Sequence, residues 1–329
     1  MKRKFNKKGF QVSFGWLFGI IVGGFILFLA IYGVAKLIST EKEISDAEGG
    51  KEIGVALNLL EIGFEESKST SLIMPIESRI HNRCSLPSSE YTFGKQGIKI
   101  SQKSLGKWSE TNTTPSFQNK YIFSNLIEEG KTFYLFAKPF KFPFKVADLV
   151  YVTSSEKKYC FKDLESINDN ADMDDIYSDI SNLHQKNLLT EDCADKGMIN
   201  VCFSDSDCEI YVSYQDGKGY VNKRYSESAD ERINFYGDAL MFAAIFSEKR
   251  VYDCQLNRLM KRANILSGIY QDKIRFLSRV GCTSDIDINL EEFKSKLDRI
   301  ENSDSLQNIA VEEILEKLTK KNDGDCQIW

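Results

Sequence analysis

The longest apolar segment of the chain lies close to its first residue. Residues 9–35 carry no charged side chain, and the stretch from Phe14 to Ala35 is almost entirely apolar. A bilayer core of about 30 Å needs about 20 apolar helical residues. A buried core helix is the alternative, but core helices are rarely this long without a polar face. The pattern therefore predicts a transmembrane helix over residues 14–38, in contact with the lipid bilayer.

The charges around this segment predict its orientation. No acidic residue precedes Glu41, whereas five basic side chains precede the helix: Lys2, Arg3, Lys4, Lys7 and Lys8. Basic flanks favour the cytoplasmic side. We therefore expect residues 1–13 to form a basic cytoplasmic tip, and the chain after Lys36 to lie outside the cell membrane. A cleaved secretory signal is the competing interpretation, but its apolar core usually spans only about 7–15 residues.

Glycines follow one face of the predicted helix. Gly15, Gly19 and Gly23 recur every four residues, so they form a face without side-chain bulk. Another helix backbone approaches such a face closely. This spacing predicts self-association or a partner helix, although glycine is also simply common in membrane helices.

The junction Lys7-Lys8-Gly9-Phe10-Gln11, followed by the apolar run, resembles the leader of type IV pilin-like proteins, especially archaeal ones. The resemblance is confined to the N-terminal segment. It implies cleavage by a membrane peptidase between Gly9 and Phe10, after which the new N-terminus begins a helix that anchors or assembles the subunit. Phe14 stands where bacterial pilins usually carry a glutamate, which argues against ordinary bacterial pilus assembly. The sequence favours a plain signal anchor over this pilin-like processing.

The cysteines are consistent with an oxidising location. All eight follow the predicted span, and an even number in an exported domain indicates disulfides: Cys84, Cys160, Cys193, Cys202, Cys208, Cys254, Cys282 and Cys326. No Cys-x-x-Cys pair occurs, which removes the main support for a zinc ribbon or a thioredoxin-like site. Free thiols remain the alternative.

The patterning beyond the anchor predicts an α+β domain with an antiparallel β-sheet core and C-terminal helices. Residues 39–68 read as a stalk helix or linker, 69–229 as mainly β, and 230–329 as a helical region that packs on the sheet. Glu129-Gly130-Lys131 and residues 215–219 are predicted turns between paired strands. Residues 163–185 are acidic and partly helical.

Four helices are predicted after residue 230. Residues 239–246 are apolar on nearly every side and should be buried. Residues 247–280 place leucines on one face and basic residues, including Arg258 and Arg262, on the other. Asn289 with Glu292 resembles a capping box, and residues 305–320 form a last helix. If the second helix is straight, Cys254 and Cys282 lie about 40 Å apart and cannot bond each other.

Composition limits the chemistry that this domain performs. Without the five N-terminal cations, 38 basic and 48 acidic side chains remain, so we expect no nucleic-acid partner. His81 and His184 lack a nucleophile motif around them, and the common phosphate-binding and dinucleotide-binding motifs are absent. The acidic runs at residues 168–175 and at Asp205, Asp207 and Glu209 lack EF-hand spacing and read as solvated loops. The sequence therefore predicts no catalytic residue, no metal site and no cofactor.

Residues 138–145 alternate phenylalanine with lysine or proline. In an extended chain Phe140, Phe142 and Phe144 point to one side. They could form a contact surface for a partner or glycan. The pattern favours the other interpretation, in which the rings lie in the core and lysine and proline protect an edge from aggregation.

These features together favour a single-pass, membrane-anchored surface protein that acts in assembly, adhesion or a structural complex. Two other functions stay open: an exported module that binds a ligand or glycan, and a membrane-tethered hydrolase that uses carboxylates outside any known motif.

Overall fold

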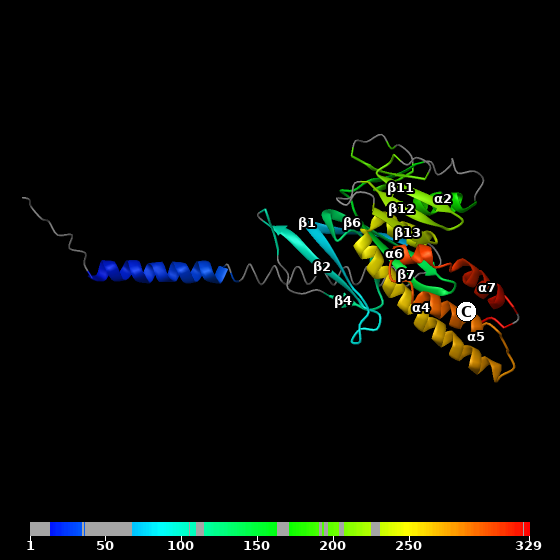
Figure 1. The fold of residues 1–329 in the computed structure, drawn as a ribbon. Helices are drawn as coiled ribbons and strands as arrows, with labels where there is room; N and C mark the ends of the chain where they lie inside the picture. The colour runs from blue at the N-terminus through cyan, green and yellow to red at the C-terminus, as the bar shows by residue number, and fades with distance from the viewer. Residues whose placement is uncertain are drawn as a thin grey trace, which may run out of the picture. The chain divides into compact units, whose positions relative to one another are not determined.

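The computed structural model of the chain describes residues 14–34, 36, 68–104, 106–109, 115–162, 171–190, 193, 197–203, 207–224, 231–324 and 326–329. The chain separates into two compact units, residues 1–48 and 49–329. The first contains an apolar helix, Phe14–Val34, and the second combines sheets with helices (Figure 1). The prediction of a mixed α and β chain with an apolar N-terminal helix and C-terminal helices is confirmed.

Two long strands form the centre of the first sheet. β1 (Lys68–Ser85) pairs antiparallel with β6 (Ile127–Lys141), and the strand order is β3-β2-β1-β6-β7-β5, with β4 paired to β2. The other strands are β2 (Lys95–Ser104), β3 (Lys107–Trp108), β4 (Ser116–Phe117), β5 (Tyr121–Phe123) and β7 (Lys145–Ser154). Neighbouring residues of β6 enter different apolar clusters, Leu135 one and Phe136 the other, as the period of two in a strand requires.

The second sheet has the order β13-β12-β11-β10-β8-β9. Its strands are β8 (Tyr159–Lys162), β9 (Leu188–Leu189), β10 (Ile199–Cys202), β11 (Ile210–Gln215), β12 (Lys218–Lys223) and β13 (Glu231–Tyr236). β11, β12 and β13 are antiparallel neighbours, but β10 pairs parallel with both β8 and β11. The predicted antiparallel core is therefore only partly correct. A parallel pair needs a long crossover, and the segment with α2 (Ala171–Asn182) separates β8 from β10.

One of the two predicted turns is present and the other is wrong. Asp216 and Gly217 have φ angles of 50° and 74° between β11 and β12, the pattern of a two-residue hairpin turn. Gly130 instead lies inside β6, opposite Ser78, where β1 bulges. Its φ is 155°, and a Cβ there would lie 2.5 Å from Oγ of Ser154. This glycine therefore permits a close approach within the sheet rather than a chain reversal.

The helix α3 (Asp238–Phe246) is buried along its apolar length, as predicted. It contacts β6 and β7 of the first sheet and β12 and β13 of the second. All eight residues from Ala239 to Phe246 are buried. Because a sheet covers each side, the helix has no polar face, and its rings extend the aromatic core through edge contacts such as Phe246 with Tyr159.

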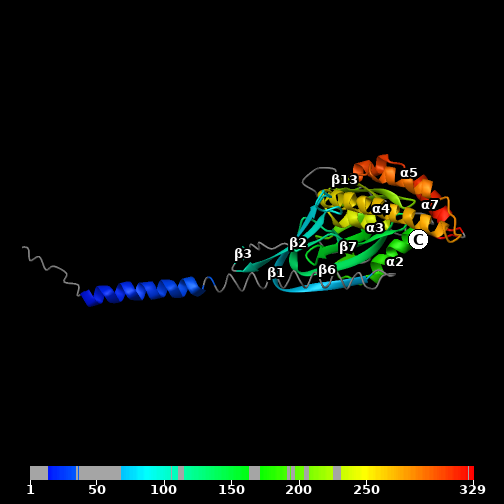
Figure 2. The ribbon, with the colours of Figure 1, turned by 90° about the horizontal axis from the view of Figure 1, so that it is seen from below.

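The helix α4 (Lys249–Ser278) is continuous through Gly268. Figure 2 shows it between β7 and α5 (Asp287–Leu297), and both elements contact it. The predicted leucine face is buried, but the placement of Arg258 on the exposed face is wrong. Arg258 is fully buried because β1, β5 and β7 of the first sheet also contact α4.

The C-terminal helices differ from the sequence prediction in their boundaries. α5 begins at Asp287 without a side-chain cap, so Asn289 and Glu292 do not form its start. The capping box is found instead at Asn302 and Ser305, before α6 (Ser303–Asn308). The predicted last helix is two helices, because Ile309 and Val311 enter the core between α6 and α7 (Glu312–Asn322) and interrupt the helical path.

Candidate functional site

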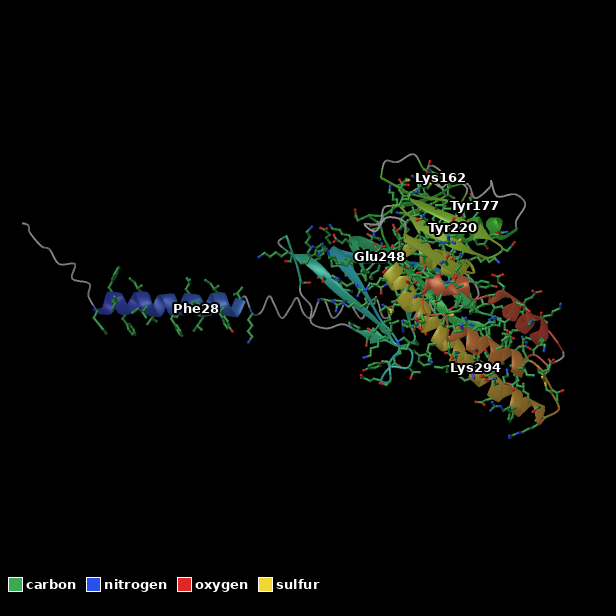
Figure 3. The ribbon with its side chains drawn as sticks, viewed as in Figure 1. Phe28, Lys162, Tyr177, Tyr220, Glu248 and Lys294 are labelled. Carbon is green, nitrogen blue, oxygen red and sulfur yellow. A yellow bond between two sulfur atoms is a disulfide. The ribbon has the colours of Figure 1, made fainter. Side chains whose placement is uncertain are left out.

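The N-terminal helix is the functional feature that the sequence predicts most directly. Phe14–Val34 is 21 residues long, which corresponds to about 30 Å, and its most apolar stretch is not buried anywhere by other described residues. Large side chains such as Phe28, which Figure 3 labels, are exposed over more than half of their surface. This length and composition are those of a membrane anchor or a signal sequence.

The glycine face of this helix is open. A Cβ at Gly15, Gly19 or Gly23 would meet no atom within 4 Å among the described residues. The predicted helix partner for this face stays a prediction. Gly9 and Phe10, the predicted processing site, lie outside the described residues.

All eight cysteines form disulfides, as predicted. The pairs are Cys84–Cys254, Cys160–Cys193, Cys202–Cys208 and Cys282–Cys326. Cys254 and Cys282 have separate partners, which confirms the inference from the straight helix. The first pair ties β1 to α4 across a sequence separation of 170 residues, so it restricts the unfolded chain strongly.

The phenylalanines of residues 138–145 do not form a contact surface. Phe140, Phe142 and Phe144 are each at most 2% exposed. Phe142 packs against Phe293 of α5, and Phe144 packs against Tyr270 of α4 and Trp329. The helical region covers these rings, so the candidate partner contact is wrong and the favoured placement of the rings in the core is correct.

The described acidic residues and the histidine that sequence analysis considered contact neighbouring side chains or backbone. Asp207 pairs with Arg224 at 3.0 Å, and Glu209 accepts hydrogen bonds from the backbone and side chain of Asn200. Asp205 lies outside the described residues. No group of three or more His, Cys, Asp or Glu in the described part of the chain is placed to hold a metal ion. His81 lies 3.1 Å from the Ser101 hydroxyl, and burial together with Lys99, Arg83 and Arg79 lowers its pKa.

Sequence patterns gave no sign of two buried ionisable groups. Glu128 is fully buried and lies 3.2 Å from Nζ of Lys157, and burial raises the pKa of the Glu128 carboxyl although this lysine opposes the rise. Lys223 of β12 donates to the backbone oxygen of Ser247, and burial lowers its pKa to about 7. Neither group borders the cleft described next.

A cleft of about 390 Å³ lies on the outer face of the second sheet. Its floor comes from β11, β12 and β13, and its wall comes from residues 306–312, at the junction of α6 and α7. Ser213, Tyr220 and Asn234 form one cross-strand row of the floor. Gln215, Lys218 and Tyr236 form the next row. Sequence reasoning missed this site because each strand alone reads as an ordinary polar face of a sheet.

Comparison with known proteins gives no relative: no protein-family model, curated protein or solved structure matches the chain.

Proposed function

We propose that this chain is a single-pass membrane protein with a cytoplasmic N-terminus, and that residues 49–329 act outside the membrane as a non-enzymatic surface component. The observation that carries the proposal is the apolar helix Phe14–Val34, which no other described residue buries. An exposed apolar surface of this length is stable only in lipid or against another protein. The basic residues before it favour retention of the N-terminus in the cytoplasm.

The disulfides support the extracytoplasmic location of the second unit. Four cystines persist in an oxidising space and are rare in reducing cytoplasm. Cys84–Cys254 and Cys282–Cys326 both attach α4 or the segment after it to distant parts of the chain. A surface protein benefits from such bonds because they restrict the unfolded chain and so stabilise the folded domain.

The role in assembly rests on the glycine face and on the pilin-like leader. Gly15, Gly19 and Gly23 offer a helix surface without side chains, which a second copy or another membrane helix would cover. Cleavage between Gly9 and Phe10 would make the helix the start of the mature chain. N-terminal sequencing of the membrane-bound protein separates a processed subunit, which begins at Phe10, from a retained signal anchor.

Membrane fractionation tests the anchor. The full chain and the double variant Phe25→Asp/Leu29→Asp are expressed side by side, with Phe25→Leu/Leu29→Ile as the matched control. Each aspartate at the helix centre costs about 2.5–3.5 kcal/mol of insertion free energy. We expect the unaltered chain and the control to stay in membranes washed with alkaline carbonate, whereas the aspartate variant is lost from them. Recovery of the unaltered chain in the soluble fraction, at full length, would contradict the anchor.

A further inference from the structure

The cleft on the second sheet carries an inference that goes beyond membrane anchoring. Tyr220, labelled in Figure 3, lies on β12 in the floor of the cleft. Tyr236 contributes a second ring from β13, and Phe142 packs against that ring edge to face from the core side. Two aromatic side chains thus lie in neighbouring rows of one open surface.

Several hydrogen-bonding groups in the cleft have no partner among the described residues. They are the hydroxyls of Ser213, Tyr220 and Tyr236 and the side-chain amides of Gln215 and Gln307, for which the structure contains no hydrogen bond. Donors and acceptors of this kind fix the orientation of a ligand with many polar groups. Aromatic rings beside them provide an apolar surface for its C–H groups.

The charges in the cleft are nearly balanced. Lys218 and Glu312 form an ion pair at 2.7 Å across the floor and the wall. Arg232 adds one cation, whose guanidinium lies 3.8 Å from the centre of the Tyr220 ring and donates to Asn234. The cleft therefore matches a ligand that is neutral or carries isolated negative charges, rather than a polyanion such as a nucleic acid.

The outer edge of the sheet argues against a peptide ligand. A peptide that adds a strand needs free backbone groups at an edge. On β13, Lys249 donates to the backbone oxygen of Arg232, and Tyr252 donates to that of Asn234. The helix α6 also lies beside β13 in Figure 1, and Asn234 donates to Ser303 at its start. Strand addition is therefore blocked at this edge.

We propose that this cleft binds a saccharide chain. Tyr220, on the ring face that Arg232 does not cover, and Tyr236 would pack against the C–H faces of sugar rings. The amides and hydroxyls of Gln215, Gln307 and Ser213 would bond the sugar hydroxyls. Arg232 favours a sugar that carries a carboxylate over its neutral counterpart. This site replaces the phenylalanines of residues 138–145 as the place for glycan recognition.

Titration calorimetry with the full chain tests the proposal. The protein is kept in a polyoxyethylene detergent, because a glycoside detergent would compete for the cleft. The acidic probe is a xylo-oligosaccharide that carries a single glucuronic acid, so it has one carboxylate. The neutral probes are the matching unsubstituted xylo-oligosaccharide and cello- and chito-oligosaccharides. The variants are Tyr220→Ala, Gln215→Ala and Arg232→Gln, and Tyr91→Ala is the matched control, because it removes a tyrosine ring that does not line the cleft.

We expect at least one probe to bind, with Tyr220→Ala weakening its binding by about tenfold or more. Arg232→Gln should weaken binding of the acidic probe and spare the neutral ones, and Tyr91→Ala should change neither. Unchanged thermal unfolding of each variant shows that the fold is retained. The proposal is overturned if no probe binds with a Kd below about 1 mM, or if binding is the same in Tyr220→Ala and Gln215→Ala. Because the measurement is made in detergent, its failure leaves the membrane anchor untouched.

Discussion

Replacing Arg258 with methionine is expected to lower the free energy of unfolding by about 3–5 kcal/mol. Its guanidinium is fully buried and donates to three backbone oxygens, those of Phe93, Lys120 and Gln118, at 2.8–2.9 Å. It also donates to Gln255 at 2.6 Å. Burial lowers the pKa of Arg258 to about 10, so the group stays charged at neutral pH.

The loss would be large because acceptors on α4 and on two other segments, at Phe93 and at Gln118 and Lys120, lose the same donor together. Gln255 belongs to a buried network with Gln96 and Asn82, in which Gln96 donates to Asn82 at 2.7 Å. Methionine fills part of the space but donates no hydrogen bond, so buried oxygens on separate segments lose their donor. This network holds α4 against the first sheet beside the Cys84–Cys254 disulfide.

Denaturant unfolding of the full chain with its disulfides intact measures this effect. Arg262→Met is the matched control, because Arg262 lies one turn further along α4 and has one such bond, to the backbone oxygen of Val146. We expect Arg262→Met to lower the free energy of unfolding by only about 1 kcal/mol. A value for Arg258→Met as small as that of the control would show that the network does not hold the helix in place.

Replacing Lys223 with methionine is expected to stabilise the protein at acidic pH and to flatten part of its pH profile. Burial lowers the Lys223 pKa to about 7, against about 10.4 in an unfolded chain. Below pH 7 both states bind the proton, so the native state carries the full cost of a buried ammonium. Between these two pKa values the native state releases the proton while the unfolded state keeps it, so stability rises with pH.

The expected size of this rise is on the order of 4 kcal/mol between about pH 6 and pH 10. In Lys223→Met this rise of stability with pH is absent. The variant also loses the hydrogen bond to the Ser247 oxygen, which lowers the free energy of unfolding by about 1 kcal/mol. The difference between the two unfolding profiles isolates Lys223 from the other titrating groups. Lys131→Met, at an exposed position of β6, is the control and should leave the profile parallel to that of the unaltered chain. A parallel profile for Lys223→Met would disprove the buried amine.

Local patterns predicted those elements whose environment is uniform along their length. Residues 239–246 read as buried because an all-apolar helix has no alternative in water, and two sheets indeed cover α3. The leucine pattern of residues 247–280 likewise predicted one straight helix. The length of that helix in turn predicted separate partners for Cys254 and Cys282.

The features that sequence reasoning missed depend on contacts between distant segments. Arginine usually lies at the surface. Arg258 is buried because the segment of residues 93–120 supplies backbone oxygens that accept its hydrogen bonds. Gly130 resembles a turn residue, yet its constraint comes from Ser154 of a neighbouring strand. The cleft combines three strands with residues 306–312, and no local motif joins these segments.

Surface labelling tests the membrane topology most directly. Spheroplasts that express the chain are treated with an amine-reactive biotin that does not cross membranes, before or after permeabilisation, and labelled peptides are identified by mass spectrometry. We predict that lysines within residues 68–329 are labelled in intact spheroplasts. Lys2, Lys4, Lys7 and Lys8 of the unprocessed chain should react only after permeabilisation, so the same sample contains its own control. Labelling of residues 68–329 only after permeabilisation would place this domain in the cytoplasm and contradict the account.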